Sequence, residues 1–198
     1  IYSVVVMLFV IFFSYLNVLY FLSNRYEDDA INLTNPFKDG KYIIMQGGSN
    51  EINVFHRRSK FSIYSFDIVR LNDFGNRANG IFPGNLHDYR IFGTDLYSPC
   101  EGTIIGVVND IDDNSPGISN QSRKAGNFIL IKSEDGITLM LAHLQKGSII
   151  VDKDDKVTYG SYLGKVGNSG NSMEPHLHIE AHRKKEGETA VPVAIKIN

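Results

Sequence analysis

Three of the six histidines lie within one short run near the C-terminal end, PHLHIEAH, at His176, His178 and His182. Because side chains alternate between the two faces of a strand, these histidines and Glu180 would share one face and the apolar residues the other. Such a face is either a solvated polar surface or a set of metal ligands. A zinc site needs three or four nitrogen, oxygen or sulfur ligands. The single cysteine, Cys100, cannot supply them, so histidines and carboxylates are the available ligands.

Three further titratable residues fall in or near expected strands. His143 ends the alternating run ITLMLAHL and is either a strand-end histidine bonded to the backbone or a site residue. Asp67 lies inside the apolar run SFDIV, where an ionised carboxylate is costly unless it is paired or metal-bound. Arg70 is its alternative partner. His56, eleven residues before Asp67, is either an exposed loop histidine or a ligand.

The elements that would position these residues are mostly β-strands. Short runs rich in β-branched and aromatic residues are separated by Gly, Asn, Asp and Pro, which is typical of strands joined by turns. These runs are KYIIMQ, SIYSFDIVR, GTIIGVVN, NFILIKS, ITLMLAHL and HLHIEAH. No stretch after Asn24 shows a long helical period with caps. Two longer loops, 72–90 and 110–126, are expected to form walls of a cleft.

The N-terminal segment has a different character, because residues 1–24 contain no charged side chain and no histidine. Its 22-residue apolar run would be about 33 Å long as a helix, enough to cross a hydrocarbon core of about 30 Å. We therefore predict a transmembrane anchor over residues 1–24, a polar linker over 25–40 and a β-rich domain over 41–198. A cleaved signal peptide and a buried core helix are the alternatives.

The composition of the 198-residue chain is that of an ordinary globular protein, which excludes a disordered tail. Its formal net charge of −2 argues against nucleic acid as the main partner, since nucleic-acid binding usually needs a basic face. One cysteine allows no disulfide within the chain.

Two consecutive segments, LAHLQKGSIIVDKDDKVTYGSYLG and GKVGNSGNSMEPHLHIEAHR, resemble the C-terminal signature of the lysostaphin/LytM-type zinc metallopeptidases. The upstream segment GTDLYSPCEGTIIGVVND is similar to the strand–Pro–Gly–strand entry of that family, and KAGNFILIKSEDG to its next hairpin. The resemblance covers residues 42–183.

This resemblance implies a fold, a metal and residue roles. The fold would be an open antiparallel, barrel-like β-structure with one zinc ion in a groove framed by loops. The zinc ligands would be His56, Asp67 and His178, and the catalytic pair would be His143 and His176. One departure concerns the first motif, which has three residues between histidine and aspartate in its compact form, whereas ten separate His56 from Asp67 here.

The resemblance further implies a zinc-dependent endopeptidase that hydrolyses peptide bonds in the stem peptide or cross-bridge of peptidoglycan during cell-wall remodelling. With the predicted anchor, the enzyme would lie in the cell membrane as a single-pass protein, its catalytic domain facing the cell wall or periplasm. Its expected partners are peptidoglycan peptides, the membrane and a possible regulatory protein.

Several alternatives stay open. The chain could be an inactive family member that regulates another wall hydrolase, although all five expected residues are present. It could be a phosphocarrier, because the sugar-transport IIA domains share a related β-architecture and use two histidines. Glu180 lies on the correct strand face to act as a rival base. His87 and His182 are expected to be exposed or at the rim of the groove.

Overall fold

The computed structural model describes residues 2–23, 30–47, 64–184, 187 and 189–198. It has one α-helix, α1 (Tyr2–Ser23), in this described part, followed by strands and two single 3-10 turns, η2 (Leu86–Asp88) and η3 (Gln121–Arg123). The prediction of a mainly β protein with one N-terminal helix is therefore confirmed.

The predicted membrane anchor is corrected. Among the described residues, no helix combines the length and the apolarity that crossing a membrane requires. The prediction rested on the length of this run and on its lack of charge, with Ser3, Ser14 and Asn17 as its only clearly polar interruptions. Asn17 turns its side-chain amide back along α1, where Nδ2 donates to the carbonyl of Phe13 at 2.8 Å. The anchor, the membrane partnership and the location inferred from them are withdrawn.

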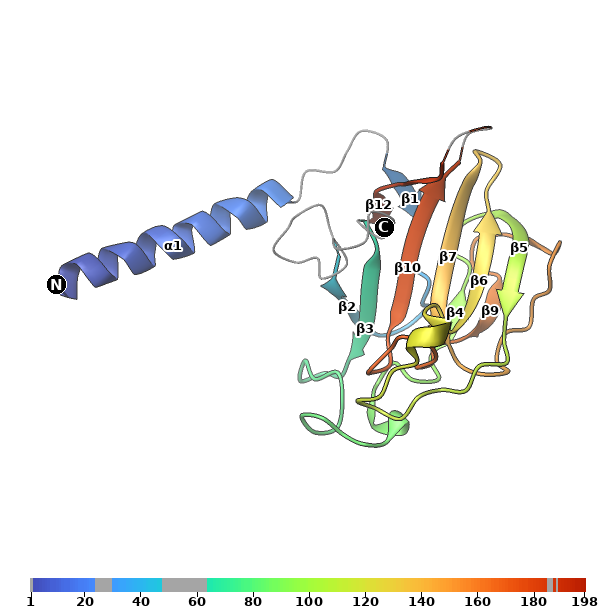
Figure 1. The fold of residues 1–198 in the computed structure, drawn as a ribbon, viewed down its shortest axis with the longest axis horizontal. Helices are drawn as coiled ribbons and strands as arrows, with labels where there is room; N and C mark the ends of the chain where they lie inside the picture. Colours follow the sequence, from blue (N-terminus) through green and yellow to red (C-terminus); the bar gives the residue numbers. More distant parts are fainter. Residues whose placement is uncertain (1, 24–29, 48–63, 185–186, 188) are drawn as a thin grey trace.

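The main sheet is antiparallel and open at both ends, and it does not close into a barrel. Its strands follow the order β2 (Lys41–Gln46), β3 (Phe66–Leu71), β10 (Leu177–Arg183), β7 (Ile137–Leu144), β6 (Asn127–Lys132), β5 (Gly102–Val108) and β8 (Lys156–Val157), with β11 (Val191–Pro192) also paired to β10. Strand β10, late in the sequence, thus lies between β3 and β7, as Figure 1 shows.

Two small strand pairs flank this sheet. β4 (Asp95–Tyr97) pairs antiparallel with β9 (Tyr162–Lys165). β1 (Ile31–Leu33) pairs parallel with β12 (Ile195–Ile197), so that two segments far apart in sequence are held together. The strand β12 and the C-terminus lie beside β1 in Figure 1.

Alternation along the central strands separates the core from the site. Ile129 on β6, Leu141 on β7 and Ile179 on β10 are fully buried in one contiguous hydrophobic cluster. The residues that alternate with these three along each strand face the other side of the sheet. On that side, His178 of β10 is paired with Ala142 of β7. Because Ala142 is small, β7 leaves space on this face next to His178.

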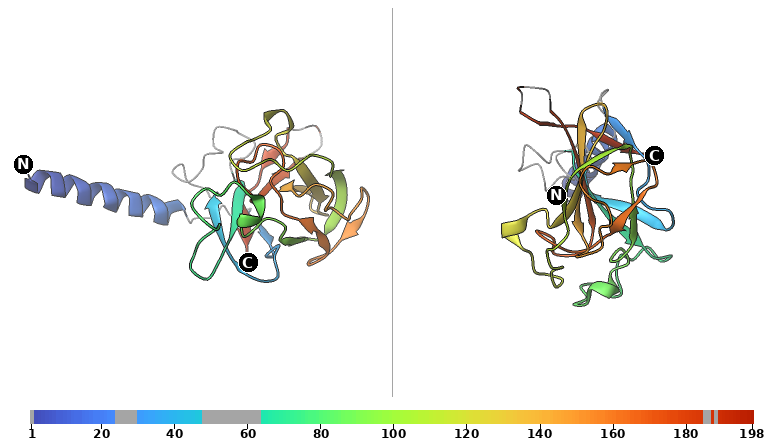
Figure 2. Two further views of the ribbon diagram at one scale, coloured as in Figure 1. Left: turned by 90° about the horizontal axis from the view of Figure 1, so that it is seen from below. Right: turned by 90° about the vertical axis from the view of Figure 1, so that its right-hand side faces the viewer.

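The two long loops lie at one end of the sheet. Figure 1 and the right-hand view of Figure 2 both show the green segment that carries η2 beneath the strands, and Figure 1 shows the yellow segment that carries η3 in front of their lower ends. An isolated bridge between Ala78 and Tyr89 gives the first loop its own internal pairing. The loops 72–90 and 110–126 therefore lie near the ends of the strands, and their role as walls of a cleft stays a prediction.

Candidate active site

Asp67 and His178 meet across two neighbouring strands. They are paired in the register of β3 and β10, and both are buried, with 7% and 6% of their surface exposed. Asp67 Oδ1 lies 2.8 Å from His178 Nδ1 and 3.6 Å from His176 Nε2. Arg70, the alternative partner considered for Asp67, instead lies over the ring of Tyr42. The contacts with His178 and His176 thus explain why a carboxylate can be buried inside this apolar strand.

The second ring nitrogen of His178 faces another carboxylate. Glu180 Oε2 lies 3.3 Å from His178 Nε2, because residues two apart on a strand share one face. Burial lowers the pKa of His178, but the hydrogen bonds to Asp67 and Glu180 outweigh it and raise the pKa to about 9. Without a metal, the ring therefore holds its proton between two carboxylates.

His143 reaches the site from the end of β7 with an unusual backbone conformation. Its φ is 63°, in the left-handed region that residues other than glycine rarely adopt. Its N–H donates to the carbonyl of Ala125 at 3.1 Å, and its own carbonyl accepts from Gly167 at 3.0 Å. His143 lies where the register of β7 with β6 shifts, since Leu144 pairs with Asn127 and Ala142 with Phe128.

The tautomer of His143 follows from its hydrogen-bond partner. Nδ1 lies 2.8 Å from the carbonyl oxygen of Ser169, which can only accept, so Nδ1 carries the proton and Nε2 has a lone pair. Burial lowers the pKa of His143 well below its ordinary value, and the neighbouring His176 and His178 lower it further. His143 is therefore a neutral imidazole at pH 7.

His176 has the same arrangement immediately before β10. Its Nδ1 lies 2.8 Å from the carbonyl oxygen of Glu174 and 3.1 Å from Ser172 Oγ. Because the carbonyl can only accept, Nδ1–H is the donor and Nε2 has the lone pair. The ring centroids of His143 and His176 are 4.7 Å apart.

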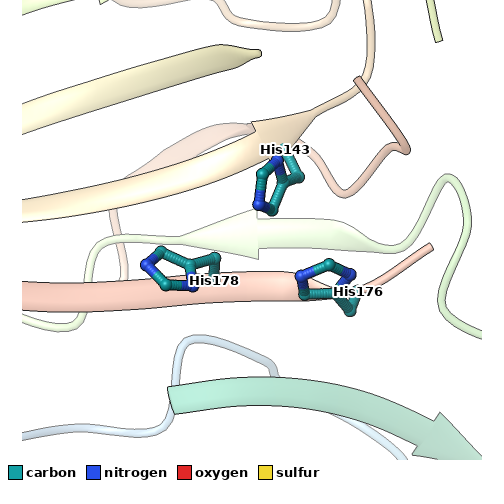
Figure 3. Close-up of side chains that lie close together, drawn as sticks. All are labelled: His143, His176 and His178. Carbon is teal, nitrogen blue, oxygen red and sulfur yellow. The ribbon is translucent and has the colours of Figure 1, made fainter. Parts of the chain in front are cut away.

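These side chains converge on one point. One ring nitrogen each from His143, His176 and His178 lies within 4.8 Å of the others, and Figure 3 shows the three rings close together, with His143 on β7, His178 on β10 and His176 just before β10. Asp67 Oδ1 adjoins this group. Imidazole nitrogen with carboxylate oxygen is a donor set that suits zinc. Four of the five predicted site residues are thus together, while His56 lies outside the described residues.

A buried polar network stands behind the two histidines. Its four members are exposed by 1% or less: Asn127, Asn168, Ser169 and Ser172. The backbone N–H of Asn127 donates to Ser169 Oγ at 2.9 Å, and Ser172 Oγ donates to Asn168 Oδ1 at 2.7 Å. The network holds the segments whose carbonyls receive the Nδ1–H groups. Sequence analysis did not identify it, although the run GNSGNS was the available signal.

The remaining predicted residues lie elsewhere. His87 is exposed and lies in η2 on the first long loop, with its ring centroid 5.2 Å from that of Phe92. His182 is half-buried near the far end of β10, paired with Thr138. Neither belongs to the cluster of three histidines, as expected. Glu180 faces the outer nitrogen of His178, on the side away from Asp67.

Comparison with known proteins agrees with this geometry. The model of peptidase family M23 matches residues 87–191, a stretch that contains His143, His176 and His178 and begins after Asp67. The chain is 32% identical over 172 residues to the peptidoglycan DD-endopeptidase ShyA of Vibrio cholerae, covering 80% of this chain and 36% of ShyA. It is 29% identical over 163 residues to the DD-carboxypeptidase/endopeptidase Mpg of Neisseria meningitidis, covering 81% and 32%. The chain therefore spans about a third of the length of these relatives.

A solved structure shares the fold. The complex of SpoIIIAH and SpoIIQ matches with a TM-score of 0.50 and 16% sequence identity, covering 82% of this chain and 96% of that one. The family model covers more than half of the chain and includes the three converging histidines. The resemblance to LytM-type enzymes is thereby confirmed, and the chain belongs to peptidase family M23.

Proposed function

We propose that this chain is a zinc-dependent endopeptidase that hydrolyses peptide bonds in the stem peptide or cross-bridge of peptidoglycan. The observation that carries the proposal is the pair of histidines, His143 and His176. Each donates Nδ1–H to a backbone carbonyl, which leaves the lone pair on Nε2, and the two ring centroids are 4.7 Å apart. Membership of a family with peptidoglycan endopeptidases among its relatives supports the substrate class.

The proposed zinc ligands are His56, Asp67 and His178, one ion per chain. Asp67 Oδ1 and His178 Nδ1, 2.8 Å apart, are the two described donor atoms. Glu180 would then accept a hydrogen bond from the remaining N–H of His178 and so orient the ring, as carboxylates commonly do behind histidine ligands. When bound, zinc supplies a Lewis acid that polarises the scissile carbonyl and makes water more acidic.

The chain's own residues would move the proton. Since His143 stays neutral at pH 7, its Nε2 can accept a proton from the attacking water. His176, with the same tautomer, can donate a hydrogen bond to the carbonyl oxygen once protonated, or return a proton to the leaving amine. The fixed Nδ1–H bonds keep both rings oriented throughout, so that little reorganisation is needed during the reaction.

The proposal is tested by digesting purified peptidoglycan of several chemotypes with the zinc-supplied protein and identifying the fragments by mass. We expect new amino termini from cleavage at a peptide bond, with no cleavage of the glycan strands. His176→Ala serves as the matched negative control. A folded, zinc-containing protein that releases no fragment from any chemotype would overturn the proposal and favour an inactive, regulatory role.

A further inference from the structure

We infer that Arg77, in the loop 72–90, is a positioning residue for His176 and acts through Glu174. The inference rests on the proposed function, because it assigns His176 a part in hydrolysis. It concerns a residue that lies 97 positions before its partner in sequence and that contributes no atom to the histidine cluster.

The guanidinium of Arg77 makes a bidentate contact with the carboxylate of Glu174. Its Nε donates to Oε1 at 2.9 Å and lies 3.2 Å from Oε2, while its Nη2 donates to Oε2 at 3.0 Å. The side chains are 30% and 25% exposed, so the pair is partly shielded from water. A planar guanidinium on a carboxylate fixes direction as well as distance, which a single ammonium contact does not.

Glu174 is also the residue whose backbone holds His176. Its carbonyl oxygen accepts the Nδ1–H of His176 at 2.8 Å and lies 2.8 Å from Ser172 Oγ. The side chain of Glu174 is thus fixed by Arg77, and its carbonyl fixes the catalytic ring. A rotation of this residue would move the acceptor of Nδ1–H and release the tautomer of His176.

The base from which Arg77 extends is itself well anchored. Asn72 Oδ1 accepts from the N–H groups of Phe74 and Asn76, which closes the turn before Arg77. The next residue, Ala78, is buried and bridges to Tyr89 across the loop. The carbonyl of Arg77 accepts from the N–H of Arg90 at 2.9 Å. Arg77 therefore connects this hydrogen-bonded loop to the short segment that carries His176 and restrains that segment.

The guanidinium of Arg77 also holds the charged carboxylate of Glu174 in its position. Glu174 lies two residues before His176, close to the centre that would hold a cation. Without Arg77, its partly buried charge would have to turn toward water or toward the site, and either change would remove the restraint on the segment that carries His176. Neutralising Glu174 alone should be milder, because Glu174→Gln keeps a side chain of the same shape that Arg77 can still contact.

The test compares four variants by steady-state kinetics on a peptidoglycan peptide: Arg77→Ala, Arg77→Lys, Glu174→Gln and Arg90→Ala. Arg90 is the matched control, since it is an arginine of the same loop whose side chain contacts Asn79 instead. We expect Arg77→Ala to lower kcat roughly 10- to 100-fold, the usual range for lost support behind a reacting group, with KM and zinc content unchanged. The kcat of Arg77→Lys should lie between those of the wild type and Arg77→Ala, and the kcat of Arg90→Ala should match that of the wild type.

Two further readouts separate positioning from general support of the structure. In the His176→Ala background, Arg77→Ala should lower the residual kcat no further, because its effect passes through that ring. Nitrogen-15 NMR of the His176 ring should show the Nδ1–H tautomer in the wild type and a mixture of tautomers in Arg77→Ala. Should Arg77→Ala itself fail to fold, Arg77→Lys and Glu174→Gln carry the same measurements.

An unchanged kcat and tautomer in Arg77→Ala would overturn the inference, as would an equal loss of kcat in the presence and absence of His176. A wild-type protein without any hydrolytic activity would instead defeat the proposed function. The NMR measurement does not depend on turnover, so it would still decide whether Arg77 controls the ring of His176.

Discussion

His143 and His176 come from different elements, yet each presents its ring in the same way. Both use a backbone carbonyl, that of Ser169 or Glu174, to hold the proton on Nδ1. A carbonyl cannot donate, so the bond selects one tautomer without adding charge. The arrangement suits groups that must accept a proton at Nε2, and it separates them from His178, which lies between two carboxylates.

Replacing the paired histidines should separate catalysis from metal binding. His143→Ala and His176→Ala should keep their zinc while kcat falls by roughly 10²- to 10⁴-fold, the range for a lost general acid or base. His178→Ala should lose the metal. Elemental analysis and peptidoglycan digestion measure the two effects, and loss of zinc from His143→Ala would show that it is a ligand.

The same experiment assigns Glu180. Because Glu180 contacts His178, a proposed zinc ligand, Glu180→Gln should weaken zinc affinity by roughly 10- to 100-fold and change kcat little at saturating zinc. A loss of turnover at saturating zinc would instead make Glu180 the base.

The stability of the metal-free protein should pass through a maximum near pH 6.5. The raised pKa of His178, about 9, stabilises the fold below pH 6.5, and this stability is lost as the pH rises to about 9. The lowered pKa of His143 has its effect on the acidic side. As the pH falls below 6.5, His143 takes up a proton only in the unfolded chain, and the folded protein therefore loses stability. Each limb should have a slope of up to about 1.4 kcal/mol per pH unit.

Urea unfolding of chelator-treated protein between pH 5 and 9 measures this curve. His178→Gln should remove the decline on the alkaline side and leave the acidic side in place. A free energy of unfolding that rises between pH 7 and 9 in the metal-free wild type would contradict the assignment.

The backbone of His143 should reverse the usual order of two substitutions. Glycine normally destabilises a strand relative to alanine, but at a φ of 63° only glycine is free of strain. We expect His143→Gly to be more stable than His143→Ala by about 1 kcal/mol. Urea unfolding of the two variants tests this, and a more stable alanine variant would show that the backbone relaxes into the strand.

At the scale of the elements, the site depends on two loops that touch through glycine. A Cβ on Gly126 would lie 2.4 Å from the carbonyl oxygen of Ser169, and one on Gly170 would lie 2.3 Å from the nitrogen of Gly126. The segment before β6 and the segment before β10 can therefore approach only because both residues lack a side chain. Their contact places the Ser169 carbonyl against His143.

Gly126→Ala should thus damage both stability and activity. Gly136 in the β6–β7 turn is the control, because it also has positive φ but meets nothing within 4 Å. We expect Gly136→Ala to cost about 1–2 kcal/mol, the strain of the left-handed region alone. Gly126→Ala should cost clearly more and lower kcat, as measured by urea unfolding and peptidoglycan digestion. Equal effects would mean that the loops can separate without consequence.

The longer strands were predictable because their hydrophobic patterns are local. The runs KYIIMQ and ITLMLAHL correspond residue for residue to β2 and β7. The alternation in HLHIEAH placed His178 and Glu180 on one face, where they are in contact. Motif resemblance indicated which histidines and carboxylate belong together, and four of the five converge.

The rest could not be predicted, because it depends on residues remote in sequence. The strands of two to four residues have too few positions to show a period, and their partners alone define them: β1, β4, β8, β9, β11 and β12. The positive φ of His143 results from bonds to Ala125 and Gly167. The Arg77–Glu174 contact joins two loops without any pattern in either. The N-terminal run shows the opposite error, where composition suggested a span that the described helix does not support.

At the scale of the whole molecule, the sheet combines neighbouring and distant pairings. β5, β6 and β7 are consecutive in both sequence and space. β10 must enter between β3 and β7, and the pair β1–β12 joins segments from opposite ends of the described domain. Ile129 in β6 and Ile195 in β12 are both fully buried in the same core, and so they report on the two kinds of pairing.

The β1–β12 pairing has a consequence for how fast the domain folds and unfolds. Closing so long a loop is entropically costly, so this pair should form after the rate-limiting step, whereas β6 should form before it. Ile195→Ala and Ile129→Ala should each cost about 2–5 kcal/mol. In stopped-flow experiments, however, the first should mainly accelerate unfolding and the second mainly slow folding. If Ile195→Ala slowed folding as much as Ile129→Ala does, this order of events would be contradicted. During synthesis, the seam beside β1 would then stay open until Ile195 has left the ribosome, after all three histidines of the site have emerged.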